Sequence, residues 1–152
     1  MLAVVRVESN FNKNAKSNKN AYGLMQIKKD TFDYVCAIYG FSYNKNQILV
    51  PEINIRVGCA YLRYLIDKFD GELEALAAYN AGEGNVKAWL KDENLSKDGK
   101  TLDKIPFKET KRYVDKVINY QKLYRGIIDE GSCTACNANN FILRRKAYLA
   151  YR

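Results

Sequence analysis

Near the start of the sequence, a glutamate lies where a core residue is expected. Four residues fall at helical positions i, i+3, i+4 and i+7 and so share one face of a predicted first helix: Met1, Val4, Val5 and Glu8. Burial among apolar side chains raises the pKa of a carboxyl group. Glu8 is therefore expected to stay protonated near neutral pH and to act as a general acid.

The composition leaves acid/base chemistry to carboxylates. The sequence has no histidine, which excludes Ser-His-Asp and Cys-His nucleophilic sites and most catalytic zinc sites. Its four cysteines are too few for a disulfide scaffold. Cys36 and Cys59 lie on apolar helical stripes and are expected to be small buried side chains. Cys133 and Cys136 form a single C-x-x-C pair, which is a weak metal or redox signal.

Polar side chains follow Glu8 directly. The segment 10–20 contains five asparagines, and the sequence GLMQ follows at residues 23–26. Such a loop is typical of solvated surface, but beside a glutamate on an apolar face it also suits the polar wall of a saccharide cleft. Amide and hydroxyl groups can both donate and accept hydrogen bonds to a sugar. Asn80 is a second polar residue on a predicted apolar helical stripe.

Helices are expected to position these side chains. Apolar residues recur at helical spacing in the segments 30–40, 51–71, 71–84, 85–90 and 108–124, and no segment shows clear strand alternation. The segment from Pro51 is expected to be the longest and central helix. Its predicted buried stripe is Ile55, Cys59, Leu62, Ile66 and Phe69. Gly58 within it predicts the close approach of another backbone or a ligand.

The chain length of 152 residues and the 47% hydrophobic content predict one compact all-α domain. After Tyr124 the sequence shows no clear helix cap and no sustained helical period. We therefore expect a domain over residues 1–125 and a tail of unknown status over 126–152. No apolar run is long enough for a membrane span, and no secretory signal is present. The net charge of +8 favours polyanions such as nucleic acid, anionic membrane or wall polymers, or it serves solubility.

Four blocks of sequence carry a family resemblance. They are VESNFN with Ser17 further on, GLMQI, NIRVGCAYLRYLIDKFDGELEALAAYNAGEGNV and IPFKETKRYVDKV, in this order over residues 2 to about 124. The chain resembles the soluble lytic transglycosylase (SLT) catalytic domain, which has a goose-type-lysozyme-like fold and cuts peptidoglycan. The resemblance implies a single lysozyme-like helical domain with a substrate cleft.

The resemblance also implies roles for individual residues. Glu8 matches the family's sole catalytic glutamate in its E-S motif. Six further positions match residues that line the family's cleft or lie beside the glutamate: Ser17, Met25, Gln26, Tyr79, Asn80 and Tyr113. Ser17 falls where the family places a serine near the N-acetyl group of the reacting sugar, and the Tyr113 hydroxyl is expected close to Glu8.

The sequence departs from the family pattern at the rim of the expected cleft. Lys13 stands where the family loop often has proline, and Lys28 and Lys29 stand where Met-Pro often follows GLMQI. These departures put subsite preferences in question rather than the reaction.

The implied reaction needs one carboxylate, whereas ordinary glycosidases use two. In the family mechanism, Glu8 would protonate the β-1,4 bond between N-acetylmuramic acid and N-acetylglucosamine. The C6 hydroxyl of the muramic acid would then attack its own anomeric carbon while Glu8 takes the proton, which leaves a 1,6-anhydro end. The resemblance implies neither a cofactor nor a metal.

Three other functions remain open at the level of sequence. A hydrolytic lysozyme on the same fold would need a second positioned carboxylate, and a non-catalytic glycan-binding module would not need Glu8. A nucleic-acid-binding protein would use the positive charge, but the basic residues are spread among acidic ones over several helices. We therefore expect no nucleic-acid partner.

The expected partners are peptidoglycan glycan strands, bound by a monomer, with possible association with wall anions through the positive charge. This substrate implies a location outside the cytoplasmic membrane, on the bacterial cell wall or envelope. An export or anchor segment is therefore expected upstream of this sequence, unless a phage or a secretion machine delivers the domain.

Overall fold

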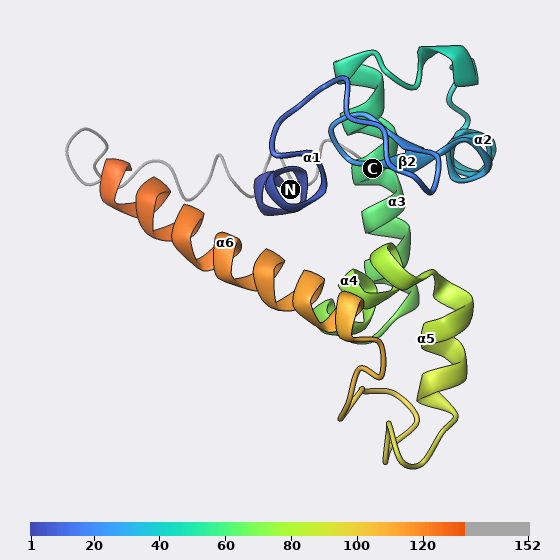
Figure 1. Cartoon of the computed structure of the whole chain (residues 1–152), viewed down its shortest axis with the longest axis vertical. Coiled ribbons are helices and arrows are strands. Elements are labelled where there is room, and N and C mark those ends of the chain that lie inside the picture. Colours follow the sequence, from blue (N-terminus) through green and yellow to red (C-terminus); the bar gives the residue numbers. More distant parts are fainter. Residues whose placement is uncertain (133–152) are drawn as a thin grey trace.

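Helix α3 (Pro51–Lys68) runs through the middle of the domain (Figure 1). A computed structural model describes residues 1–132. The other elements are α1 (Leu2–Ser9), β1 (Ala21–Tyr22), β2 (Ile27–Lys28), α2 (Lys29–Tyr39), the 3-10 helix η1 (Lys45–Gln47), α4 (Glu72–Ala81), α5 (Glu83–Leu90) and α6 (Lys108–Ser132). The all-α prediction is confirmed, although α6, with 25 residues, is longer than α3, with 18.

The first helix presents Glu8 in its last turn. Val4 and Val5 are buried as predicted, whereas Met1 is exposed because it precedes the helix. The helix ends at Asn10, whose φ of 51° is left-handed and whose backbone N–H donates to the carbonyl of Arg6. This conformation suits asparagine at a helix end. Helix α1, seen end-on in Figure 1, packs against α6, and this contact forms one side of the site.

The segment between α1 and α2 is a loop closed by two short strands. β1 and β2 pair antiparallel, with Ala21 opposite Lys28 and Tyr22 opposite Ile27. At Gly23, φ is +76° and a Cβ atom would lie 2.5 Å from the Asn54 side chain, so only glycine fits. This requirement accounts for the glycine that opens GLMQ.

The buried face of α3 differs from the predicted stripe. Asn54, Val57, Gly58 and Leu65 are buried, whereas Ile66 is 44% exposed. The prediction was correct for Phe69, which is buried, and wrong for Ile66, because α2 and α4 pack on α3 and cover a different face. A close approach at Gly58 is present, but it is made by the Met25 side chain and not by a backbone or a ligand as predicted, since a Cβ atom at Gly58 would lie 2.4 Å from the Met25 sulfur.

Helices α4 and α5 are separated at Gly82, whose φ is 90°, and α4 packs against α3 and α6. Cys36 is buried as predicted, Cys59 is half-buried, and both are free thiols. Within residues 1–132, no helix is long and apolar enough to cross a membrane.

Helix α6 continues past residue 125 to Ser132. The division of the chain at 125 remains a prediction. Cys133 and Cys136, with the rest of the predicted tail from residue 133, lie outside the described residues.

Candidate active site

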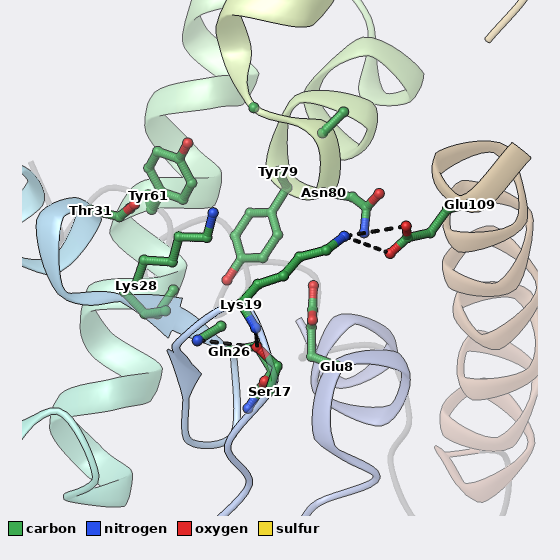
Figure 2. A pocket seen from close by; sticks show the side chains of 14 residues that line it. Glu8, Ser17, Lys19, Gln26, Lys28, Thr31, Tyr61, Tyr79, Asn80 and Glu109 are labelled. Carbon is green, nitrogen blue, oxygen red and sulfur yellow. Dashed lines mark hydrogen bonds and ion pairs between the residues drawn. The ribbon is translucent and has the colours of Figure 1, made fainter. Parts of the chain in front are cut away.

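Glu8 lies where two pockets of one cleft meet. The first pocket has a volume of about 250 Å³ and the second about 380 Å³, and Glu8, Asn80 and Glu109 line both. Figure 2 shows the Glu8 carboxylate directed into the first pocket, below Tyr79 and between α1 and the loop that carries Ser17. Glu8 therefore faces a space that can hold a ligand on either side of it.

Burial sets the protonation of Glu8. Its enclosure raises the pKa from 4.5 to about 7, and the nearby Tyr113 hydroxyl opposes this rise. The Tyr113 hydroxyl is buried and makes no hydrogen bond of standard geometry with any described residue. Tyr113 and Glu8 line the second pocket together, so the Tyr113 hydroxyl lies close to Glu8, as predicted, and is available to donate to it. A carboxyl group with a pKa near 7 can give and take a proton at neutral pH.

Tyr79 forms the opposite wall of the first pocket. Its hydroxyl donates a hydrogen bond of 2.8 Å to the backbone carbonyl of Met25. Burial and the charge of Glu8 raise the pKa of Tyr79 well above 10, so its hydroxyl stays neutral. The Met25 side chain is fully buried, so it packs in the core and does not line the cleft as predicted. Its backbone, not its side chain, supports the site.

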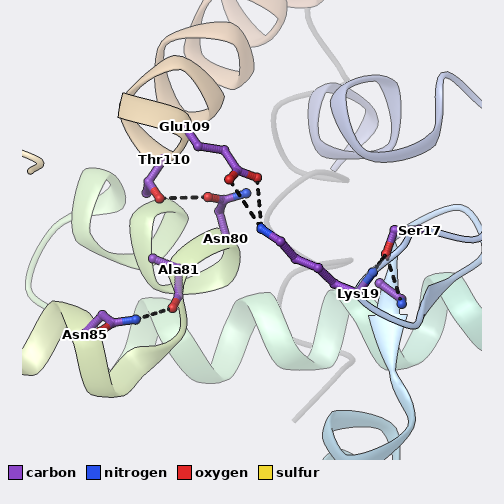
Figure 3. Close-up of polar contacts among 8 residues, drawn as sticks. Ser17, Lys19, Asn80, Ala81, Asn85, Glu109 and Thr110 are labelled. Atoms are coloured by element: carbon purple, nitrogen blue, oxygen red, sulfur yellow. Dashed lines mark hydrogen bonds and ion pairs between the residues drawn. The ribbon is translucent and has the colours of Figure 1, made fainter. Parts of the chain in front are cut away.

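Three more of the predicted residues line the first pocket, each held by hydrogen bonds. Asn80 accepts a 2.8 Å bond from the Thr110 hydroxyl, which fixes its amide (Figure 3). The Ser17 hydroxyl accepts from the backbone N–H groups of Lys19 and Ala21. Gln26 has a left-handed φ of 48°, and its side-chain amide donates to the carbonyls of residues 15 and 23. Gln26 thus stabilises the loop as well as lining the cleft.

Sequence reasoning did not find an ion pair that crosses the mouth of this cleft. The Lys19 ammonium lies 3.2 Å from the Glu109 carboxylate, and both side chains are more than 70% exposed. Figures 2 and 3 show the long Lys19 side chain reaching from the loop to the start of α6. Their separation of 90 residues leaves no local pattern in the sequence.

Three other lining residues were also missed: Lys28, Thr31 and Tyr61. Lys28 is one of the departures from the family pattern at the rim, and Thr31 lies in the first turn of α2. Tyr61 lies three residues after Gly58 and seven after Asn54, a spacing that places it on their face of the helix.

Comparison with known proteins identifies the family. The model of the transglycosylase SLT domain matches residues 1–102. The chain belongs to the SLT domain family. The four blocks of this SLT domain meet at the cleft, since Glu8, Gln26, Asn80 and Tyr113 each come from a different block and line one of its two pockets.

Proteins similar to this SLT domain are named lytic murein transglycosylases. The soluble lytic murein transglycosylase of Escherichia coli strain K12 is 38% identical over 129 residues, which covers 82% of this chain and 20% of the relative. The membrane-bound lytic murein transglycosylase C of Edwardsiella ictaluri is 31% identical over 150 residues and covers 84% of this chain and 42% of the relative. The chain thus spans about one fifth of the length of the soluble relative.

Solved structures agree on the fold of the SLT domain. An inactive variant of the lytic transglycosylase Slt from Pseudomonas aeruginosa has a TM-score of 0.72 at 36% identity, covering 84% of this chain and 21% of that chain. The 70 kDa soluble lytic transglycosylase of Escherichia coli has a TM-score of 0.73 at 34% identity over the same 84% and 21%. A third structure is the complex of the 70 kDa enzyme with bulgecin A.

Proposed function

We propose that this domain is a peptidoglycan lytic transglycosylase, with Glu8 as its acid and then its base. The observation that carries the proposal is the enclosure of Glu8, with a pKa of about 7, between two pockets of a cleft in an SLT domain. A single group with this pKa can serve both steps near neutral pH.

In the first step, protonated Glu8 gives its proton to the glycosidic oxygen between N-acetylmuramic acid and N-acetylglucosamine. The bond from the anomeric carbon to that oxygen breaks, and the carbonyl oxygen of the N-acetyl group stabilises the anomeric carbon as an oxazolinium. In the second step, the C6 hydroxyl oxygen bonds to the anomeric carbon, the bond from that carbon to the N-acetyl oxygen breaks to restore the acetamide, and Glu8 takes the hydroxyl proton. The attack is intramolecular, and effective molarities of about 10⁵ M favour such reactions.

The cleft also supports this reaction over hydrolysis. Glu109 is the other carboxylate that lines both pockets in the described part of the chain. It is 72% exposed and paired with Lys19, so it lacks the enclosure of Glu8. Hydrolysis would require a carboxylate that positions water. Glu8 acting alone is the better match to this arrangement.

The other predicted residues would bind the substrate. Ser17, Gln26 and Asn80 offer hydroxyl and amide groups to sugar hydroxyls and N-acetyl groups along the first pocket. Tyr113 would donate to the Glu8 carboxylate after the first proton transfer. The proposed partner is a peptidoglycan glycan strand bound by a monomer, with secondary attraction of wall anions to the positive charge. The proposed location is therefore the cell wall or envelope.

Mass spectrometry of soluble products tests the proposal. Purified peptidoglycan is incubated with the protein, with Glu8→Gln and with Glu109→Gln. We expect products one water lighter than hydrolytic ones from the protein and from Glu109→Gln, and none from Glu8→Gln. Reducing-end products that disappear in Glu109→Gln would instead identify a lysozyme. Binding to peptidoglycan without any products would identify a glycan-binding module.

A further inference from the structure

Two basic side chains of α6 line the second pocket together with Glu8. Arg112 and Lys116 lie four residues apart on this helix, so they share one of its faces. The pocket, with its volume of about 380 Å³, also includes Val7 and Tyr113 and lies where α1 packs against α6. A ligand in this pocket would therefore meet both cations and the proposed catalytic acid.

The side chains of Arg112 and Lys116 do not take part in the fold. Both residues are exposed, and within residues 1–132 no hydrogen bond or ion pair joins either side chain to another residue. Lys19, the other cation beside Glu109, is by contrast held in an ion pair with it. The guanidinium and the ammonium groups of the α6 pair thus keep their hydrogen-bond donors for a ligand.

The charges of the second pocket favour an anionic ligand. Its acidic lining residues are Glu8 and Glu109. Glu8 is protonated when the proposed reaction begins, so it carries no charge at that point. The Glu109 oxygens lie 3.2 and 3.3 Å from the Lys19 ammonium, which offsets their charge. Arg112 and Lys116 therefore leave an excess of positive charge, and a guanidinium beside an ammonium suits the two oxygens of a carboxylate.

One of the two sugars in the proposed substrate carries such a group. N-acetylmuramic acid differs from N-acetylglucosamine by a lactyl ether on C3. This substituent ends in a free carboxylate, or it continues as a peptide stem that has carboxylates of its own. Because the two sugars alternate, a pocket that adjoins the cut bond lies within one sugar of an N-acetylmuramic acid, whichever way the strand runs.

We propose that Arg112 and Lys116 determine specificity by binding a carboxylate on the C3 substituent of an N-acetylmuramic acid in the strand that passes Glu8. The inference rests on the proposed function, because it assumes that this strand occupies the cleft. The lactyl group supplies the carboxylate in strands without stems, and the peptide supplies it in strands with stems. In both cases an anionic strand binds better than a neutral glycan of the same length.

Calorimetry on a background of Glu8→Gln tests this specificity with three hexasaccharides at one ionic strength. The first contains only β-1,4-linked N-acetylglucosamine and is neutral. The second alternates N-acetylglucosamine with N-acetylmuramic acid and has no stems, and the third is the same strand with peptide stems. These probes separate the lactyl carboxylate from the carboxylates of the stem.

We expect Arg112→Gln and Lys116→Gln each to weaken binding of at least one anionic strand by about three- to tenfold, as for the loss of one charge-assisted hydrogen bond. Binding of the neutral hexasaccharide should stay unchanged. A loss confined to the stem-free strand would assign the lactyl carboxylate, and a loss confined to the stem-bearing strand would assign the stem. The matched control is Lys122→Gln, which removes an exposed cation of the same helix that lines neither pocket of the cleft.

Three results would overturn the role of the two cations. They are unchanged binding of both anionic strands, an equal loss for the neutral hexasaccharide, and an equal loss in Lys122→Gln, which would indicate only diffuse attraction. Product analysis with the unsubstituted protein separates these failures from that of the proposed function. Anhydro products together with any of the three would overturn the specificity alone, whereas a lack of anhydro products would overturn the function on which it rests.

Discussion

The side chain of Asn54 holds the backbone of Met25. Its carbonyl oxygen accepts a 2.8 Å hydrogen bond from the Met25 N–H, and its amide donates to the carbonyls of Tyr22 and Ile48 at 2.9 and 2.8 Å. Asn54 is fully buried on α3. Because the Met25 carbonyl also accepts from Tyr79, one central asparagine supports the loop that forms the cleft wall.

Asn54→Ala is expected to lower the free energy of unfolding by about 2 to 4 kcal/mol, because it leaves one buried N–H and two carbonyls without a partner. Urea denaturation measures the change. Asn85→Ala is the matched control, since its amide donates one hydrogen bond in an exposed position. Equal losses in the two variants would contradict the supporting role of Asn54.

Gly58→Ala is expected to destabilise the fold by about 1 to 3 kcal/mol despite the better helix propensity of alanine. The added Cβ would lie 2.4 Å from the Met25 sulfur and 2.7 Å from the Met25 Cβ. Gly84→Ala on α5 is the control, because nothing lies within 4 Å of its added Cβ. Thermal unfolding should show a loss for the first variant and a gain of up to about 1 kcal/mol for the second. A gain in both would disprove the close approach.

The raised pKa of Glu8 links stability to pH. The folded protein binds the Glu8 proton more tightly than the unfolded chain, so stability is lost as pH rises from about 4.5 through about 7. Glu8→Gln removes this penalty. Its free energy of unfolding should exceed that of the unsubstituted protein by about 3 kcal/mol at about pH 8 and should match it at about pH 4. Denaturation at both pH values measures the difference, which a solvated Glu8 would not produce.

Tyr113→Phe is expected to shift the pH profile of activity. The Tyr113 hydroxyl lowers the pKa of Glu8, so its removal should raise that pKa above about 7. Because Glu8 must begin protonated, kcat/KM should fall at high pH, and this fall should move to higher pH in the variant. Tyr124→Phe on the same helix should leave the profile in place. A lower rate with an unshifted profile would indicate that Tyr113 acts only in packing.

Local spacing was enough to predict the helices and the unusual place of Glu8. A residue seven positions after Met1, on the face of Val4 and Val5, shares their side of α1 in any helix. The requirement for glycine at Gly58 could also be predicted from the sequence. Glycine inside a helix costs stability, so its presence there indicates that another group approaches closely. The sequence did not predict which atoms approach Gly58. The structure shows that they belong to the Met25 side chain.

Tertiary packing decided the rest. Helical spacing defines the faces of α3 but not the neighbours that cover them, which is why Ile66 proved exposed and Asn54 buried. The Lys19–Glu109 pair joins two segments that lie 90 residues apart in the chain. The sequence by itself thus determined the helices, the glutamate and the family, because these depend on local spacing and on motifs. Only the tertiary structure determined the walls of the cleft and how far the pKa of Glu8 rises, because both depend on which helices exclude water from one another.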